Sequence, residues 1–218
     1  MYTFYYCDGT RAAAAEMALA EAGAPYTSTV IDISKDEHRS AEYLAVNPRG
    51  TVPALAVNNQ VVACETIAIM MYVADEHQAT HIAPPPGNST RATMLDWLSY
   101  HACEVQEPMK VYYYPWRYSP NDDAIDKVKE MAVARFSERW QIVETHLSEN
   151  GPYHLGTQCS LVDLYMLVTG AYCNHLATFD HPAIDECMKR TAERSAIAEI
   201  YQRHIQGFGD LKAARLPQ

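Results

Sequence analysis

Two segments of the sequence carry groups that could bind an extended peptide. Residues 47–55 read N-P-R-G-T-V-P-A-L, and residues 64–69 read C-E-T-I-A-I. Pro53 opens a predicted strand, a position where its missing N–H removes no hydrogen bond from the sheet. If the Val52-Pro53 peptide bond is cis, the backbone N–H and C=O of Val52 turn outward, where they could pair with a peptide laid alongside. The first segment therefore predicts backbone recognition of an extended ligand.

The second segment predicts a site for a charged amino-acid end. Glu65 and Thr66 begin a predicted helix, and the unpaired amides and positive dipole end of a helix attract a carboxylate. Glu65 adds an acceptor for an ammonium group beside that carboxylate. A zwitterionic α-amino acid end and an extended peptide backbone, held together, describe a γ-glutamyl tripeptide as the ligand.

Strand-like and helical runs alternate in the first part of the chain. We expect strands at Tyr2–Tyr6, Tyr26–Ile33, Ala54–Val57 and Val61–Ala63, and helices at Arg11–Ala22, 38–45 and Glu65–Glu76. The resulting order, βαβ followed by ββα, is typical of a small α/β layer domain.

Three consecutive prolines, residues 84–86, cannot lie in a helix or a central strand and indicate a linker. After the linker, apolar residues recur only at helical spacing. Ser160 and Asp163 have the spacing of a capping box. The helix that they open, Leu164–Leu176, is apolar on nearly every face and should be central to its domain. The expected organisation is a first domain at 1–78, a linker at 79–89 and an all-helical domain at 90–218.

The composition excludes several classes of protein. The chain has 218 residues, and 48% of them are hydrophobic, which is enough to bury a core without metal or disulfide support. Lys and Arg total 17 against 27 Asp and Glu, and this net charge of −10 argues against a nucleic-acid or anionic-membrane binder. No apolar run approaches the roughly 18 residues of a membrane-spanning helix, and the first residues lack the features of a signal peptide. We therefore expect a cytoplasmic protein.

The six cysteines are scattered, with no C-x-x-C pair and no metal-binding spacing with histidine. This pattern indicates free thiols of a reducing compartment and no bound metal. Cys103 is expected to be a small core residue; the alternative is that its side chain faces the binding cleft. Cys7 is set apart because it directly follows the first predicted strand.

In this combination and order, the motifs resemble those of cytosolic glutathione transferases, specifically bacterial members of that superfamily. The resemblance covers most of the chain and rests on the segment 47–55, on the pair Glu65-Thr66 in place of the family's Glu-Ser, and on the S-x-x-D capping box at 160–163. It implies a thioredoxin-like first domain, an all-α second domain and a homodimer. It also implies detoxification chemistry with glutathione as the co-substrate, bound mainly by the first domain.

The resemblance assigns binding roles to individual residues of the first segment. Val52 matches the residue that pairs through its backbone with the cysteine of glutathione, and Pro53 matches the cis-proline. Glu65 and Thr66 match the γ-glutamyl clamp.

Two further residues fall near the peptide by the same resemblance. Thr51 sits beside it, and His38 falls where several classes place a histidine near the glycyl carboxylate. The alternative for His38 is a solvated position on the polar face of a short helix.

Three alternatives remain for the group that activates the glutathione thiol, whose pKa in water is near 8.5. The family uses Tyr, Ser or Cys at the end of the first strand. Cys7 could replace the serine, donating a hydrogen bond to the thiolate or forming a mixed disulfide. Tyr5, or less readily Tyr6, could donate its phenolic proton. Backbone amides and the Thr10 hydroxyl could act instead, with Arg11 adding positive field. The catalytic cysteine of the bacterial beta class would fall on or near these two positions and is missing there, which argues against a beta-class assignment.

The second domain is expected to hold the electrophile. Five aromatic residues lie between Tyr112 and Tyr118, of which Tyr112 and Trp116 are the candidate lining residues for an apolar or aromatic molecule. The alternative is that these rings pack against the helical core or the dimer partner. The tail from Gly207 to Gln218 is expected either to fold over the cleft or to fray.

The sequence thus predicts a transferase in which a glutathione thiolate attacks an electrophilic small molecule. Glutathione-dependent chemistry without net conjugation is an alternative: thiol–disulfide exchange, dehalogenation, ether cleavage or isomerisation. A second alternative is a non-catalytic glutathione-binding module, against which the intact γ-glutamyl clamp argues.

Overall fold

The structure is a computed structural model that describes residues 1–215. Its contacts form two compact units: residues 1–85 together with the chain from Ala192 onward, and residues 86–191. The chain from Ala192 joins the first unit because helix α9 (Ala198–Arg215) packs on helix α1 (Ala12–Glu21). The boundaries expected from the sequence, with a first domain at 1–78, a linker at 79–89 and a second domain at 90–218, stay a prediction.

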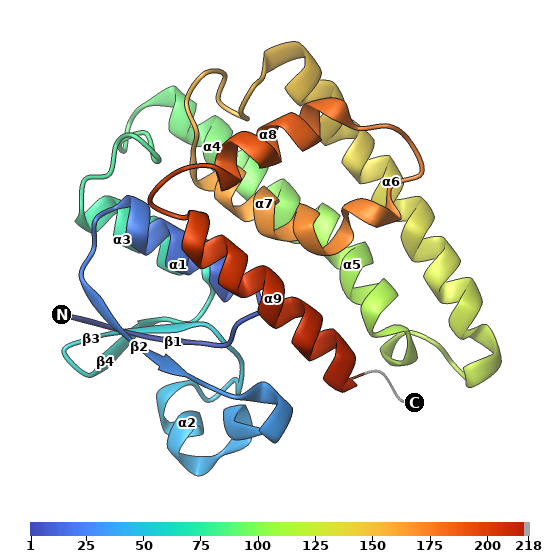
Figure 1. Cartoon of the computed structure of the whole chain (residues 1–218), viewed down its shortest axis with the longest axis horizontal. Helices are drawn as coiled ribbons and strands as arrows, with labels where there is room; N and C mark the ends of the chain where they lie inside the picture. Colours follow the sequence, from blue (N-terminus) through green and yellow to red (C-terminus); the bar gives the residue numbers. More distant parts are fainter. Residues whose placement is uncertain (216–218) are drawn as a thin grey trace. The chain divides into compact units, whose positions relative to one another are not determined.

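A four-stranded mixed sheet forms the centre of the first unit (Figure 1). Its strands are β1 (Tyr2–Tyr6), β2 (Tyr26–Val30), β3 (Ala54–Val57) and β4 (Gln60–Ala63), in the order β2-β1-β3-β4. Strand β1 runs parallel to β2 and antiparallel to β3, and β3 runs antiparallel to β4. This is the thioredoxin-like arrangement that the sequence predicts.

Alternation along β1 separates the two faces of the sheet. Tyr2, Phe4 and Tyr6 are buried, whereas the intervening side chains are partly exposed, as expected for a strand whose neighbouring side chains point to opposite faces. The strand predicted at Tyr26–Ile33 is shorter in the structure and ends at Val30. It ends there because the Asp32 side chain accepts from the Ser34 N–H and starts a 3-10 turn.

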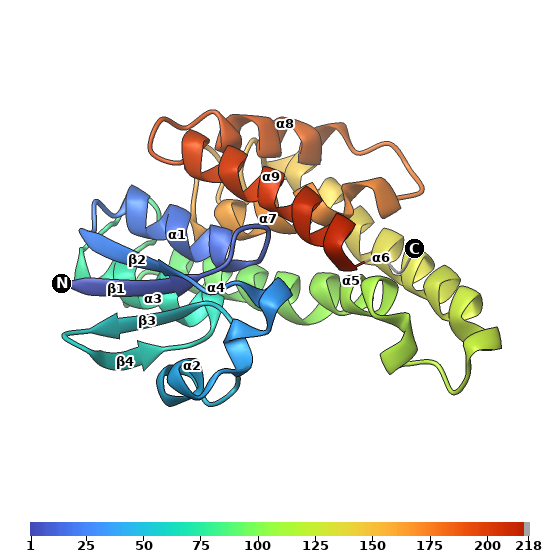
Figure 2. The same cartoon turned by 60° about the horizontal axis from the view of Figure 1, so that its bottom comes forward.

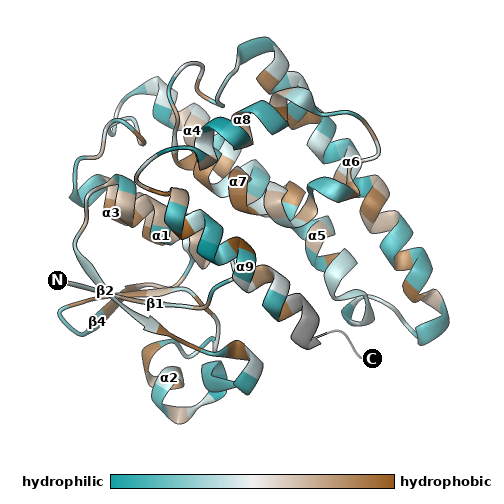
Figure 3. Cartoon of the chain, in the orientation of Figure 1, coloured by the Kyte–Doolittle hydropathy of each residue, from teal (hydrophilic) through white to brown (hydrophobic). Residues whose placement is uncertain are grey.

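Helices α1 and α3 (Thr66–Glu76) cover one face of this sheet, and α2 (Ala41–Val46) lies on the other (Figure 2). The four alanines at 12–15 are fully buried and allow α1 and α3 to pack closely; the ribbon of α1 is mostly tan in Figure 3. The helix predicted at 38–45 starts later because the Ser40 hydroxyl caps it at the Tyr43 N–H.

The predicted tail is helical from Gly207 to Arg215, as the last part of α9, so it does not fray over these residues. Residues 216–218 lie outside the described chain.

The second unit is built from α4 (Ser89–Tyr100), α5 (Gln106–Tyr113), α6 (Ile125–Asn150), α7 (Leu161–Cys173) and α8 (Pro182–Ala192). A π-helical turn at His101–Val105 joins α4 to α5. Helix α7 is buried along nearly its whole length, which confirms the prediction that it is central. None of the helices in the described part of the chain is long and apolar enough to cross a membrane.

The predicted capping box is present at the start of α7. The fully buried Asp163 carboxylate accepts from the Ser160 N–H at 2.7 Å and from the Ser160 hydroxyl at 2.9 Å. Its other oxygen accepts from the His154 backbone N–H at 3.0 Å and faces Nδ1 of the same residue at 2.8 Å. Burial alone would raise the pKa of Asp163, but the hydrogen bonds from His154 outweigh it and lower that pKa.

A second histidine extends this buried network. Nε2 of His101 lies 3.0 Å from Nε2 of His154, and both residues are almost fully buried. Because a carboxylate can only accept, Nδ1 of His154 donates to Asp163. Nδ1 of His101 is buried without a hydrogen-bond partner within the described residues.

Candidate functional site

The predicted binding residues of the first unit converge at one end of the sheet. Cys7 follows the last residue of β1, and Val52 and Pro53 directly precede β3. The antiparallel register pairs Tyr5 with Ala54, so the two chain segments beyond these residues leave the sheet side by side. Strand β4 ends at Ala63, whose partner is Leu55, and the start of α3 therefore follows at the same end (Figure 2).

Val52 presents its backbone at this end. The Val52-Pro53 peptide bond is cis, as the sequence analysis anticipates. Within residues 1–215, neither the N–H nor the C=O of Val52 bonds to another backbone group. These two groups can therefore pair with an extended ligand, because they are not used by the sheet itself.

Two side chains that the sequence analysis missed fix the turn before Val52. Nδ2 of Asn47 and the hydroxyl of Tyr43 both donate to the carbonyl of Thr51, each at 2.7 Å. Oδ1 of Asn47 accepts from the Arg49 N–H at 3.1 Å. Asn47 is fully buried and Tyr43 nearly so, and together they set the orientation of the peptide group that leads into Val52.

Replacing Asn47 by alanine should lower the free energy of unfolding by about 1–3 kcal/mol, because it leaves a buried carbonyl and a buried N–H short of a partner. Tyr43→Phe removes only one of the two donors to Thr51 and should cost about 1 kcal/mol. Urea unfolding followed by circular dichroism measures both, with the exposed Tyr118→Phe as the control. Equal stabilities of Asn47→Ala and Tyr118→Phe would contradict this role.

Gly50 brings the turn close to the short 3-10 segment at 37–39. It adopts a φ of +57°, and a Cβ there would lie 2.7 Å from Nη1 of Arg39 and 3.0 Å from the carbonyl oxygen of His38. The His38 side chain is only 16% exposed, with Nε2 4.0 Å from a carboxylate oxygen of Asp36. His38 is therefore not the solvated position that the alternative for this residue describes.

The start of α3 holds the two predicted clamp residues. Glu65 is the N-cap residue and Thr66 is buried in the first turn. The Glu65 carboxylate accepts from Nη1 of Arg49 at 2.8 Å, and both side chains are well exposed, at 71% and 60%. An ion pair this exposed contributes about 0–1 kcal/mol, so a ligand ammonium group can share or replace it at little cost.

The loop between β1 and α1 holds three candidate activating residues. Cys7 is 7% exposed. The Thr10 hydroxyl donates to the Cys7 carbonyl at 2.7 Å and accepts from the Ala12 N–H at 3.3 Å. Because a hydroxyl has a single proton, Thr10 would have to give up this bond to donate to a thiolate. Arg11 is the N-cap residue of α1.

The two candidate tyrosines point to opposite faces of the sheet. Tyr5 is partly exposed on the α2 side, its ring 6.1 Å from that of Tyr43. Tyr6 is buried on the α1 side, 5.3 Å from the guanidinium of Arg203 and 5.8 Å from the ring of His204. Burial raises the pKa of Tyr6.

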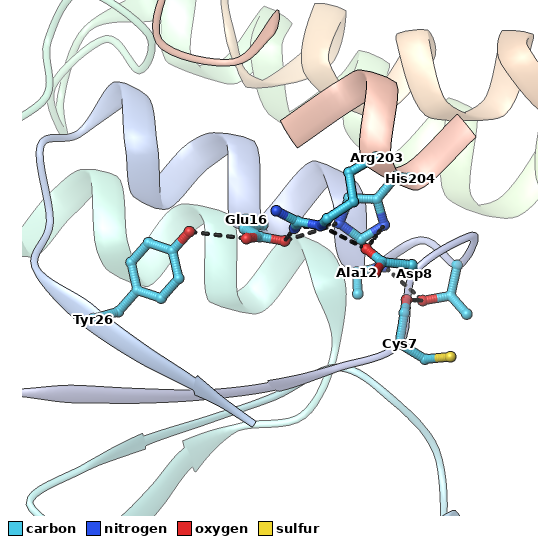
Figure 4. Close-up of polar contacts among 8 residues, drawn as sticks. Cys7, Asp8, Ala12, Glu16, Tyr26, Arg203 and His204 are labelled. Atoms are coloured by element: carbon cyan, nitrogen blue, oxygen red, sulfur yellow. Dashed lines mark hydrogen bonds and ion pairs between the residues drawn. The ribbon is translucent and has the colours of Figure 1, made fainter. Parts of the chain in front are cut away.

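A polar network that the sequence analysis missed joins this loop to α9 (Figure 4). Arg203 donates from Nε to the Asp8 carboxylate at 2.8 Å and from Nη2 to the Glu16 carboxylate. Nε2 of His204 lies 2.9 Å from the same Glu16 oxygen, and Tyr26 donates its hydroxyl proton to Glu16 at 2.9 Å. The sulfur of Cys7 points away from these groups.

The aromatic residues predicted to hold the electrophile lie in the second unit. Trp116 is 59% exposed, with its ring 5.6 Å from that of Tyr114. Tyr112 makes edge contacts with Tyr113 and His175. The hydroxyl of Tyr113 donates to the Tyr172 carbonyl at 2.6 Å, so at least this ring packs within the unit, as the alternative for the cluster proposes.

The expectation of a buried Cys103 is wrong, because this thiol is exposed. His101 and Val105 are the buried residues of the π-helical turn. Cys103 lies two positions from each of them, which places it on the opposite side of a helix.

Known proteins match the chain over most of its length. The family model for the glutathione S-transferase N-terminal domain matches residues 11–76. Glutathione S-transferase GstA of Escherichia coli O157:H7 is 26% identical over 89% of this chain and 94% of its own. The GST-like protein YncG of Escherichia coli K12 is 30% identical over 76% of this chain and 79% of its own.

Solved structures of glutathione transferases are also similar to the chain. A glutathione transferase homolog from Sulfitobacter, crystallised with bound glutathione, matches with a TM-score of 0.82 and 26% identity, over 94% of this chain and 99% of that one. A glutathione transferase from Methylococcus capsulatus matches with a TM-score of 0.79 and 27% identity, over 94% and 98%.

The fold defines the class of the protein: a thioredoxin-like domain followed by an all-helical region. The relatives narrow this class further. The chain belongs to the glutathione S-transferase family of enzymes.

Proposed function

We propose that the protein binds glutathione at the sheet end where β1 ends and β3 begins, and ionises its thiol for attack on an apolar or aromatic electrophile. The observation that carries this proposal is the convergence at that end of Cys7, the start of α3 and the backbone of Val52, which bonds to no other backbone group of the described residues. The glutathione named in the structure of the Sulfitobacter homolog supports the choice of ligand.

Each group of the tripeptide has a complementary partner in this arrangement. The backbone of the cysteinyl residue pairs with the N–H and C=O of Val52. The preceding carbonyl, that of Thr51, is held in place by hydrogen bonds from Tyr43 and Asn47. The γ-glutamyl carboxylate lies at the α3 N-terminus beside Thr66, and its ammonium group binds the exposed Glu65 carboxylate. His38 and the turn at Gly50 lie next to each other and bind the glycyl end.

The thiol is activated from the loop after β1. Cys7 is our first choice for the donor because it directly follows the strand and its side chain is directed away from the Arg203 network (Figure 4). Tyr5 is the second choice, since its ring lies on the α2 face. Thr10 contributes by holding the carbonyl of Cys7, with Arg11 adding positive charge at the start of α1.

The remaining parts of the proposal concern the assembly and the second substrate. Tyr112 and Trp116 contact the electrophile, and the protein is a cytoplasmic homodimer, as the family resemblance implies. Thiol–disulfide exchange is the second candidate activity, and the thiol of Cys7 next to the proposed glutathione site favours it.

The thiolate absorbance of bound glutathione between pH 5 and 9 tests the mechanism. We expect half-ionisation about two pH units below the free value near 8.5, which corresponds to about 2.7 kcal/mol of preference for the thiolate. Cys7→Ala and Tyr5→Phe, measured separately, should identify the donor by which of them raises the pKa of the bound thiol. Cys159→Ala and Tyr72→Phe serve as matched controls.

Two results would decide against parts of this scheme. Binding of glutathione without any lowering of the thiol pKa would overturn the transferase mechanism. When oxidised glutathione is added, exchange with the Cys7 thiol would give a mixed disulfide and release one molecule of reduced glutathione. This adduct, detected by mass spectrometry of the intact protein and lost in Cys7→Ala, would favour thiol–disulfide exchange.

A further inference from the structure

The β1–α1 loop packs directly on α9, backbone against backbone. Gly9 adopts a φ of +74°, and a Cβ on it would lie 2.3 Å from the backbone nitrogen of Phe208. A Cβ on Gly207 would lie 2.5 Å from Cβ of Asp8. Neither glycine can carry a side chain without moving the loop or the helix, so the position of α9 fixes the loop that holds Cys7.

Charged groups reinforce this contact on one side of the loop. Arg203 bridges two carboxylates, with Nε 2.8 Å from Oδ1 of Asp8 and Nη2 bonded to Oε2 of Glu16. His204 is 1% exposed and lies between the same carboxylates, with Nε2 2.9 Å from Glu16 and Nδ1 3.6 Å from Asp8. Hydrogen bonds to charged partners such as these are among the stronger ones in proteins.

The network keeps the buried Glu16 carboxylate ionised. Burial would raise the pKa of Glu16, but hydrogen bonds from His204 and Arg203 outweigh burial and lower it. Tyr26 and Tyr6 are the other titratable groups facing the network, from β2 and β1, and burial raises the pKa of each. They are therefore uncharged near neutral pH, and Arg203 supplies the permanent positive charge.

The negative charge of Asp8 can affect the glutathione thiol because of where this residue lies in the chain. Asp8 is the residue directly after Cys7, at the end of the sheet where the glutathione thiol is proposed to ionise. A negative charge near a thiol disfavours the thiolate and raises the thiol pKa. Arg203 neutralises Asp8 and at the same time holds the loop through it.

We propose that Arg203, supported by His204, is a positioning residue for thiol activation, which acts through Asp8 by fixing the Cys7 loop and by cancelling the charge beside it. This inference rests on the proposed function. It assigns to the last helix of the chain a role in the chemistry of the first domain.

The test compares the pKa of glutathione thiol bound to variants that separate charge from packing. Arg203→Gln leaves Asp8 negative and should raise the bound thiol pKa by on the order of one unit, a tenfold loss of thiolate at low pH. Adding Asp8→Asn to Arg203→Gln removes the negative charge and should return the thiol pKa to the wild-type value. Arg203→Lys keeps the charge and should shift the pKa little.

Arg190→Gln is the matched control. Arg190 lies on α8 rather than on α9, and it forms an exposed ion pair with Glu186 of the same helix. If Arg203→Gln does not fold, Asp8→Asn alone decides: with Arg203 retained, the bound thiol pKa should fall below the wild-type value.

Three outcomes would count against this role. If Arg203→Gln loses stability but keeps the wild-type thiol pKa, the residue is only structural. If the double variant stays as impaired as Arg203→Gln, the charge argument is wrong. If wild-type protein itself binds glutathione without lowering its thiol pKa, the proposed function fails first, and the role of Arg203 fails with it.

Discussion

Replacing Asp163 by alanine should lower the free energy of unfolding by about 3–5 kcal/mol, a large part of the 5–15 kcal/mol typical of a folded protein. The carboxylate is fully buried and accepts from Ser160 and His154. Losing it leaves these donors without partners, which costs more than the roughly 1 kcal/mol of an exposed helix cap. Urea unfolding at pH 7 gives the difference.

Asp126→Ala is the matched control, since Asp126 lies in the first turn of α6 and is exposed. If Asp163→Ala does not fold, Asp163→Asn keeps the shape and one acceptor oxygen and should retain part of the stability. A loss of less than about 1 kcal/mol in Asp163→Ala, equal to that of the control, would show that the buried carboxylate is not a major support of α7.

Acidification from pH 7 to 5 should destabilise the protein through His101. Burial first, and then the nearby His154 and His146, hold the pKa of His101 well below 6.5 in the folded state. The unfolded chain takes up a proton near pH 6.5, so the stabilisation is complete above this pH and decreases below it. The slope from this one group approaches 1.4 kcal/mol per pH unit.

His101→Phe should remove most of that slope while also lowering stability at pH 7, because His154 loses its hydrogen-bond partner at Nε2. The free energy of unfolding at intervals between pH 7.5 and 5 measures both effects. His175→Phe, an exposed histidine of the same unit, is the control and should leave the slope unchanged. An unchanged slope in His101→Phe would mean that other groups cause the acid sensitivity.

Local patterns were enough to predict several elements of the fold. The strand at Tyr2–Tyr6 and the capping box of Ser160 and Asp163 are set by residues close in sequence, and both are present in the structure. The cis bond before Pro53, which the family resemblance implied, is present as well. The π-helical turn was not predictable in this way, and Cys103 was wrongly predicted to be buried.

Contacts between distant residues account for what the sequence did not predict. Arg203 is separated from its partners Asp8 and Glu16 by most of the chain, and no local periodicity connects them. Tyr43 and Asn47 lie close to the predicted site, but nothing in their spacing indicates that both side chains converge on one carbonyl. Tertiary packing, which a single sequence leaves open, decides these contacts.

The grouping of α9 with the first unit also sets the order in which contacts of this unit can form during synthesis. A ribosome adds about 5–20 residues per second, so on the order of 5–20 s pass between the emergence of Pro85 and that of Ala192. Throughout that interval Glu16 has neither Arg203 nor His204 as a partner. Of the hydrogen bonds that Glu16 accepts in this network, only the one from Tyr26 can therefore form before α9 has been synthesised.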